Sequence, residues 1–314
     1  MRIGIDAMGG DFAPNNEVLG AIAALPHLGQ GSRVVLFGDK NQIEEIIKSE
    51  GVDVASFDII HTTEIIGMND HPAKAFVQKP DSSISVGFTA LAKGEINGFA
   101  SAGNTGAMMA AAMYSVKVID GIIRPCISSD LPLMTGGSAL ILDVGFNSDC
   151  KPEMLYQYAL LGSIYASEVM DINNPRVALL NIGEEEEKGD ILTKASYELM
   201  KGTKDFNFVG NVEGHALFSG KVADVVVCDG FVGNVVLKMA EGFYRIALKQ
   251  GIDNEFFNRF NYEVYGGTPA LGVNAPVIIG HGASSPMAIK NMILQTEHVI
   301  KAELVRKVKE ALTK

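Results

Sequence analysis

Short runs of hydrophobic residues alternate along this chain with longer segments that mix hydrophobic and polar residues. The short runs have the length of buried strands, and the mixed segments have the length of helices. Most of the short runs end in a turn that combines Gly with Asp, Asn, Ser, Glu or His. We predict strands at residues 2–6, 33–37, 56–61, 98–100, 139–142, 176–180, 207–209, 224–228 and 277–279, and helices at residues 15–25, 41–50, 84–93, 153–170, 191–200 and 287–312.

This alternation predicts an α/β fold, an open, largely parallel sheet with helices on both faces. In such sheets ligands bind beyond the carboxyl ends of the strands. We therefore expect several of the polar glycine turns to meet at one cleft. The sequence contains no linker, repeat or low-complexity segment, and we predict a single α/β domain over residues 1–314.

Composition narrows the class of protein. Of the 314 residues, 47% are hydrophobic and 20% are charged, as in a compact enzyme rather than a disordered chain. The formal net charge of -11 argues against non-specific binding of nucleic acid. Cys126, Cys150 and Cys228 lie far apart in the sequence, which argues against a zinc site and a disulfide framework. Since we find no signal-peptide pattern and no membrane-spanning run, we expect a cytoplasmic protein, at most peripheral to a membrane.

The turn that follows residues 98–100 is a candidate anion site. It joins a strand to an Ala- and Met-rich helix, so backbone N–H groups and the positive end of the helix dipole converge there. Such a turn suits phosphate, although a small-residue turn of this kind can also serve α/β packing alone. We expect phosphate to bind Ser101, Gly103, Asn104 and Thr105, with Lys74, Lys79 and Lys151 as counter-charges.

The polar turns also form an ordered series of motifs. The series consists of Asp6-Ala-Met-Gly-Gly-Asp11, Ser101-Ala-Gly-Asn-Thr-Gly-Ala107, Arg124-Pro125, Asp143-Val-Gly, Asn181-Ile-Gly-Glu-Glu with Lys188-Gly189, Gly210-Asn-Val-Glu213, Asp229-Gly-Phe-Val-Gly-Asn234 with Leu237-Lys238 and Glu241-Gly242, and His281-Gly282. In this order the motifs resemble those of the bacterial phosphate acyltransferase family, PlsX, over most of the chain.

The resemblance implies both a fold and an activity. The implied fold is similar to that of the isocitrate and isopropylmalate dehydrogenases and of phosphotransacetylase. The implied reaction transfers a fatty acyl group from acyl carrier protein to inorganic phosphate and gives an acyl phosphate for phospholipid synthesis. The resemblance also implies a homodimer and no cofactor.

This reaction can be matched to particular residues. Phosphate is already a nucleophile, so the site needs a phosphate cradle, donors for the developing oxyanion and help for the departing thiolate. Asn104 belongs to the candidate cradle, and Asn234 is a candidate oxyanion donor, although it can also serve only as a helix cap. His281 is a candidate acid for the leaving sulfur, a phosphate ligand, or a structural residue of its turn.

Acidic residues at the predicted strand ends have a supporting role in this hypothesis. We interpret Asp6, Asp11, Asp143 and Asp229 as turn formers that orient neighbouring polar groups, with a Mg²⁺ site as the alternative. Because the reaction has no pyrophosphate to neutralise, we predict no metal. Residues 184–187 are expected to form a solvated acidic loop rather than a site. The family motifs single out Glu184, Glu185 and Lys188 there, and Lys238 in the helix after Asp229, as supporting residues.

Two hydrophobic segments have alternative roles. The Met and Ala residues at 108–113 are expected in the core, with an acyl channel as the alternative. Residues 241–265 correspond to a helical excursion that is longer in the resembled family, where it is implicated in dimer contact and membrane association. Phe256, Phe257, Phe260 and Tyr262 lie in it around Arg259, so contact with a bilayer surface or burial against a dimer partner are both open.

Two other classes of function stay open at this point. An ATP-dependent phosphotransferase is one, because Ile5-Asp-Ala-Met-Gly-Gly loosely resembles the phosphate loops of sugar kinases. A non-catalytic carrier-protein or membrane scaffold is the other, but it leaves the polar strand ends unexplained. A dehydrogenase is disfavoured because the chain has no GxGxxG motif.

Overall fold

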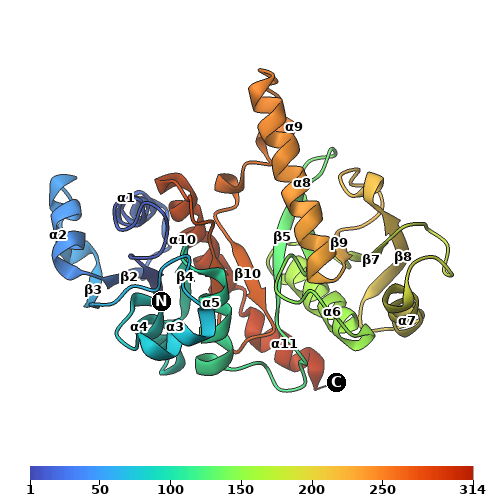
Figure 1. Cartoon of the computed structure of the whole chain (residues 1–314), viewed down its shortest axis with the longest axis horizontal. Helices are drawn as coiled ribbons and strands as arrows, with labels where there is room; N and C mark the ends of the chain where they lie inside the picture. The colour runs from blue at the N-terminus through green and yellow to red at the C-terminus, as the bar shows by residue number, and fades with distance from the viewer. Residues whose placement is uncertain (314) are drawn as a thin grey trace. The chain divides into compact units, whose positions relative to one another are not determined.

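A computed structural model of the chain describes residues 1–313 and divides into two compact units (Figure 1). Unit 1 consists of Met1–Ile119 and Tyr262–Val305, and unit 2 consists of Asp120–Asn261 and the chain from Arg306 onward. The chain therefore passes from unit 1 to unit 2, returns to unit 1 and ends in unit 2. That the chain acts as a single domain stays a prediction, and each unit is described by itself.

Unit 1 is built on six strands in the order β3-β2-β1-β4-β11-β10. The first five are mutually parallel, and β10 runs antiparallel to β11. The strands are β1 (Arg2–Asp6), β2 (Arg33–Gly38), β3 (Asp58–His61), β4 (Gly98–Ser101), β10 (Thr268–Leu271) and β11 (Val277–Ile279). The helices are α1 (Asn15–Ala24), α2 (Lys40–Ser49), α3 (Pro72–Gln78), α4 (Ser83–Ala92), α5 (Thr105–Ala111) and α10 (Pro286–Lys301).

Helices cover both faces of this sheet. Phe99 of β4 points to α4, because a Cβ at Gly87 of that helix would meet its ring. A Cβ at the preceding Gly98 would instead meet Thr296 and Ile300 of α10. Since successive side chains of a strand point to opposite faces, α4 and α10 lie on opposite sides of β4. Phe99 also contacts the rings of Phe37 and Phe88, which makes the α4 side an aromatic core.

Unit 2 is built on five strands in the order β5-β6-β9-β7-β8. All neighbouring strands are parallel except β5 and β6, which form an antiparallel pair. The strands are β5 (Cys126–Pro132), β6 (Ser138–Leu142), β7 (Arg176–Asn181), β8 (Asn207–Glu213) and β9 (Val225–Val227). The helices are α6 (Pro152–Glu168), α7 (Ile191–Met200), α8 (Gly230–Lys249) and α9 (Glu255–Asn258).

These observations confirm the predicted α/β class and the largely parallel sheet. The pattern of hydrophobic runs missed β5 and β10, the two strands that run antiparallel to their neighbours. The predicted helix at residues 287–312 is wrong in one respect, because α10 ends before a break and α11 (Leu304–Leu312) begins after it. Glu303 has φ 51°, a left-handed conformation that cannot continue a right-handed helix.

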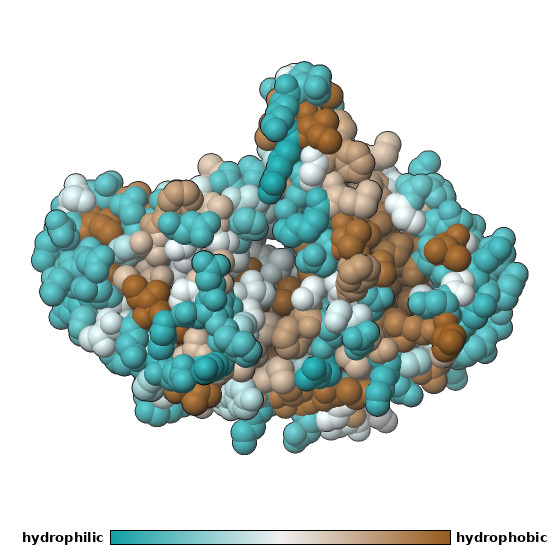
Figure 2. Space-filling model, in the orientation of Figure 1, coloured by the Kyte–Doolittle hydropathy of each residue, from teal (hydrophilic) through white to brown (hydrophobic). Residues whose placement is uncertain are grey.

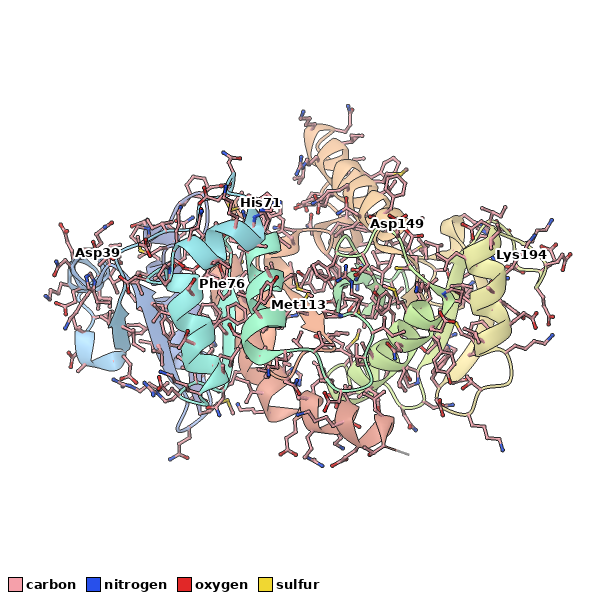
Figure 3. All side chains as sticks on the ribbon, turned by 60° about the horizontal axis from the view of Figure 1, so that its bottom comes forward. Asp39, His71, Phe76, Met113, Asp149 and Lys194 are labelled. Atoms are coloured by element: carbon pink, nitrogen blue, oxygen red, sulfur yellow. The ribbon has the colours of Figure 1, made fainter. Side chains whose placement is uncertain are left out.

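The Met and Ala residues after the first candidate turn lie in the core of unit 1. Met108 and Met109 of α5 have no exposed surface. Helices α3 and α5 pack side by side, and Figure 3 shows Phe76 on α3 and Met113 just beyond α5. The core interpretation of these residues is therefore confirmed for Met108 and Met109.

The predicted helical excursion belongs to α8, α9 and the short helix η5 (Tyr262–Val264). Helix α8 begins at Gly230, before the predicted excursion, and its C-terminal part projects from the rest of unit 2 as an arm (Figure 1). No helix among residues 1–313 combines the length and the apolar character that crossing a bilayer requires.

Candidate functional site

Three neighbouring strands of unit 1 end in turns that contact one another. The amide of Asp11, after β1, donates to the carbonyl of Gly282, after β11, at 2.7 Å. The amide of Gly280 donates to the carbonyl of Ser101, the last residue of β4, at 2.8 Å. A Cβ at Gly103 would lie 3.2 Å from the Cα of Gly9, so glycine is needed for these turns to approach so closely. Unit 1 thus brings together the turns that contain Asp6, Asp11, Gly103 and His281.

A buried hydrogen-bonded pair anchors the first two turns. Ser101 Oγ donates to Asp6 Oδ2 at 2.6 Å and accepts from the amide of Gly103 at 2.9 Å. Neither side chain is open to solvent, since Asp6 is 1% exposed and Ser101 is 0% exposed. Burial raises the pKa of Asp6, and the bonds from Ser101 and Ser83 lower it in part. Ser101 is therefore engaged in holding the turn rather than directed at a ligand.

Asn104 connects the candidate turn to a second loop. Its Oδ1 accepts from the amide of Ala107 at 3.0 Å, which caps α5. Its Nδ2 lies 3.2 Å from the carbonyls of Gly67 and Met68 and 3.1 Å from that of Asp70. The amide group of Asn104 is thus already occupied by backbone groups, so the geometry gives it a positioning role. Figure 3 labels His71, where this loop enters α3.

Three further residues predicted to bind phosphate differ in their surroundings. Lys79 Nζ pairs with Asp70 Oδ2 at 2.6 Å and donates to the carbonyl of Ile65 at 2.7 Å. This ammonium group therefore holds the same loop that Asn104 holds. Lys74 and Thr105 are exposed, and Thr105 opens α5 beside the glycine turn.

His281 lies in the turn after β11 with one nitrogen oriented by the backbone. Its Nδ1 accepts from the amide of Ala283 at 3.2 Å, which places the proton of the neutral ring on Nε2. The ring of Tyr262 stacks on it, with centroids 4.7 Å apart. The Tyr262 hydroxyl donates to the carbonyl of Ala283 at 3.0 Å, so ring and turn are held together. The orientation of the His281 ring is thus fixed by its own turn and by Tyr262.

In unit 2, Asp143 organises the turn after β6. Its carboxylate accepts from the amides of Ile127, Phe146 and Asn147 at 2.7 to 3.3 Å. The side chain of Asn147 donates a fourth bond at 2.9 Å. Asp143 is fully buried, and burial raises its pKa against these bonds, which lower it. In the structure Asp143 thus holds this turn through its hydrogen bonds.

Helix α8 begins against this turn. Asp229 caps it by accepting from the amides of Phe231 and Val232 at 2.9 and 3.0 Å. Asn234 therefore does not cap this helix, so the alternative that it serves only as a helix cap is wrong. Instead Asn234 Nδ2 donates to the carbonyl of Val144 at 3.2 Å. The predicted oxyanion role of Asn234 stays a prediction.

The remaining residues predicted for unit 2 lie at other places on its surface. Lys151 precedes α6 and is exposed. Glu184 and Lys188 are exposed in the acidic loop, which Asn181 holds by donating to the carbonyl of Lys188 at 3.2 Å. Lys238 pairs with Glu241 on α8 at 2.7 Å. Among residues 1–313, no group of three or more His, Cys, Asp or Glu side chains is arranged to hold a metal ion.

Sequence reasoning missed three residues that shape these turns. Asn147 follows the predicted Asp143 closely in the sequence, which was the only available signal for it. Tyr262 was considered only for contact with a bilayer or a dimer partner, whereas its ring stacks on His281. Glu17, in the first turn of α1, is 1% exposed although nothing in the local pattern distinguishes it from a surface residue. Burial raises the pKa of Glu17 to about 8, with Asp6 and Asp11 adding to the effect.

Comparisons with known proteins found relatives that cover the whole chain. A family model described as fatty acid synthesis protein matches residues 1–253. A phosphate acyltransferase from Dictyoglomus turgidum is 42% identical over 333 aligned residues, which cover 100% of this chain and 98% of that protein. A phosphate acyltransferase from Heliobacterium modesticaldum is 44% identical, with 99% of this chain and 97% of that protein covered.

Solved structures with the same fold have low sequence identity. A phosphotransacetylase from Streptococcus pyogenes matches with a TM-score of 0.68 and 19% identity, covering 96% of this chain and 94% of that one. A 4-hydroxythreonine-4-phosphate dehydrogenase from Burkholderia phymatum matches with a TM-score of 0.50 and 14% identity, covering 98% and 97%. These likenesses confirm the dehydrogenase-like fold class.

Proposed function

The chain belongs to the phosphate acyltransferase (PlsX) family, and we propose that it transfers a fatty acyl group from acyl carrier protein to inorganic phosphate. The product is an acyl phosphate that serves phospholipid synthesis. The observation that carries this proposal is the 42% identity to a phosphate acyltransferase over 100% of the chain. The glycine turns at the ends of β1, β4 and β11 support it, because they let an anion approach the backbone.

We assign phosphate to the turns of unit 1. Thr105 offers an exposed hydroxyl at the end of the Ser101–Gly106 turn, and the glycines at 9, 10 and 103 keep side chains away from the backbone. Asn104 and Lys79 act by fixing the neighbouring loop at residues 65–70. In the reaction a phosphate oxygen forms a bond to the thioester carbon and the carbon–sulfur bond breaks.

We assign to His281 a hydrogen bond to the departing sulfur, whose proton then comes from solvent. Its Nε2–H is oriented by the bond that Nδ1 accepts from Ala283 and by the stacked ring of Tyr262. Because the ring is neutral, it stabilises the developing negative charge as a hydrogen-bond donor and keeps its proton, and a preorganised donor of this kind contributes about 100-fold or more to the rate. We expect His281→Gln to lower kcat by that factor while leaving the KM for phosphate within about threefold, because the cradle is intact. Tyr262→Phe is the comparison variant: it keeps the ring stack and removes only the hydroxyl bond to Ala283, so it should lower kcat less than His281→Gln does.

The test of the function is release of free thiol from a long-chain acyl carrier protein, with and without inorganic phosphate. Hydroxylamine is added to trap the acyl phosphate as a hydroxamate. We expect release to depend on phosphate, to yield hydroxamate, and to need neither ATP nor Mg²⁺. Release that requires ATP would favour the phosphotransferase alternative, and binding of the carrier protein without turnover would favour the scaffold.

We also propose that the chain forms a homodimer through α8. Five of its large apolar side chains share one face and are 43% to 67% exposed: Phe231, Val235, Met239, Phe243 and Ile246, here named the α8 stripe. Figure 2 shows hydrophobic residues along this arm. A stripe of this length favours contact with a second copy, since monomers rarely expose contiguous apolar patches of this size.

We also propose that the aromatic segment, residues 256–262, contacts a membrane surface. Phe256 packs on Phe257 and Phe260, with ring centroids 5.7 and 5.2 Å apart, and Phe260 packs on Phe218. Arg259 donates to the carbonyls of Gly137 and Leu133. The segment is therefore partly used inside unit 2. Loss of vesicle binding by a Phe256→Ser, Phe257→Ser variant that remains dimeric would support membrane contact, and unchanged binding would exclude it.

A further inference from the structure

Glu17 is a buried carboxyl group that the proposed reaction does not use. It lies in the first turn of α1 and is 1% exposed. Its Oε2 has no hydrogen-bond partner among the described residues. An unpartnered carboxylate at such a position is costly, so the group is stable only while it is neutral.

The neighbours of Glu17 do not offer a compensating positive charge. The charged groups that act on it are Asp6 and Asp11, both at the end of β1 and both negative. Helix α10 packs on α1. About one turn after Glu17, at Gly20, it contributes the uncharged residues Pro286 and Ile289. Burial and the two aspartates raise the pKa of Glu17 to about 8, which keeps it protonated at neutral pH.

Glu17 lies directly beneath the turns to which we assign phosphate. A Cβ at Gly10 would lie 2.7 Å from Glu17 Oε1, 3.3 Å from the carbonyl of Gly282 and 3.6 Å from the Cβ of Ala102. Gly10 has φ +132°, which is accessible to glycine and keeps this contact free of a side chain. The carboxyl group therefore touches the residue at which the turns after β1, β4 and β11 converge.

We infer that Glu17 is a positioning residue that acts in its neutral form and limits phosphate binding in alkaline solution. While neutral, it supports the Gly9–Asp11 turn without placing charge beneath the anion. When Glu17 ionises, its unscreened negative charge lies next to the turn and repels the phosphate dianion. This inference rests on the proposed function, because it uses the assignment of phosphate to these turns.

The experiment measures inorganic phosphate binding by calorimetry, and the KM for phosphate, at pH 7 and pH 9.5. For the unmodified chain we expect both constants to rise about tenfold over this interval. Glu17→Gln keeps the size of the side chain but cannot ionise, so the rise should fall to twofold or less. Glu17→Leu is a second non-ionisable variant, should the Gln variant fail to fold. Glu45→Gln, at an exposed position of α2, is the control and should keep the full rise.

The outcomes separate this inference from the proposed function. A rise in the Glu17 variants equal to that of the unmodified chain, or no rise in the unmodified chain, would overturn the inference. Phosphate binding at pH 7 without any phosphate-dependent thiol release would overturn the function and leave the binding comparison to decide the role of Glu17. No phosphate binding at pH 7 would overturn both.

Discussion

At the scale of single residues, the polar side chains of the turns hold backbone more often than they face solvent. Ser101 holds Asp6 and Gly103, while Asn104 holds the loop at residues 67–70. Thr105 and Lys74, by contrast, are exposed in unit 1. Two predictions at this scale separate holding from binding.

Asn104 and Thr105 are adjacent but should respond differently to truncation. Asn104→Ala removes the α5 cap and the donor to three carbonyls, so we expect the free energy of unfolding to fall by about 2 to 3 kcal/mol. Thr105→Ala removes one exposed hydroxyl, so we expect a stability change within about 0.5 kcal/mol and a KM for phosphate raised about tenfold. Urea unfolding and steady-state kinetics check the pair. Equal stability losses in both variants would contradict the positioning role of Asn104.

Glu17 also makes stability depend on pH. Its pKa is raised from an ordinary 4.5 to about 8, so the folded state holds this proton more tightly than the unfolded chain does. The resulting stabilisation is full below pH 4.5 and is lost as the pH rises through 8, by a few kcal/mol. Glu17→Gln should therefore lose less free energy of unfolding than the unmodified chain between pH 5 and pH 9. If the free energy of unfolding fell with pH equally in both proteins, Glu17 would not be the group responsible for the fall. Asp6 and Asp143 also have raised pKa values and remain in both proteins.

At the scale of elements, the first turns of α8 pack tightly against the turn that contains Asp143, whereas its later turns are exposed. Gly233 packs against the carbonyl of Asp143, while Gly242 two turns later has open space around it. The same helix therefore contains a glycine that packing requires and a glycine that packing does not require.

These two glycines make a matched test. A Cβ at position 233 would collide with the Asp143 carbonyl and lie 3.0 Å from Cys228 Sγ, so Gly233→Ala should cost about 3 kcal/mol of stability. Gly242→Ala adds a methyl group in open space and removes a flexible residue from a helix, so it should stabilise the protein by up to about 1 kcal/mol. Thermal unfolding of the two variants decides the matter. Similar melting temperatures would mean that the start of α8 does not pack on the Asp143 turn as described.

At the scale of the whole molecule, a net charge of -11 accompanies an apolar stripe on α8. Acidic surfaces of two copies repel one another, so association has to rest on a local apolar contact. The α8 stripe is the longest exposed apolar feature on a single helix of the described chain.

Charge placed in the α8 stripe should therefore separate the two copies. We expect the double substitution Met239→Glu, Phe243→Glu to shift the protein from dimer to monomer in sedimentation velocity at micromolar concentration. Lys194→Glu on α7, an exposed residue labelled in Figure 3, introduces the same side chain elsewhere in unit 2 and should leave the dimer intact. A dimeric double variant that has lost binding to anionic vesicles would instead identify the stripe as a membrane surface.

The sequence by itself determined the fold class, most strands and helices, and the identity of the turns at the strand ends. It could do so because hydrophobic runs, glycine and capping residues act over a few neighbouring residues. The antiparallel strands β5 and β10 escaped prediction, since their direction depends on partners distant in the chain.

Only the tertiary structure decided what each polar side chain does. Asn104 and Lys79 look alike in sequence as candidate anion ligands, but contacts with Gly67, Asp70 and Ile65 assign them to a loop. Glu17 looks like a surface residue until the turns around Gly10 and Gly282 enclose it. Burial and hydrogen bonding are set by residues far apart in the sequence, and they determine whether a polar group binds, holds or carries a proton.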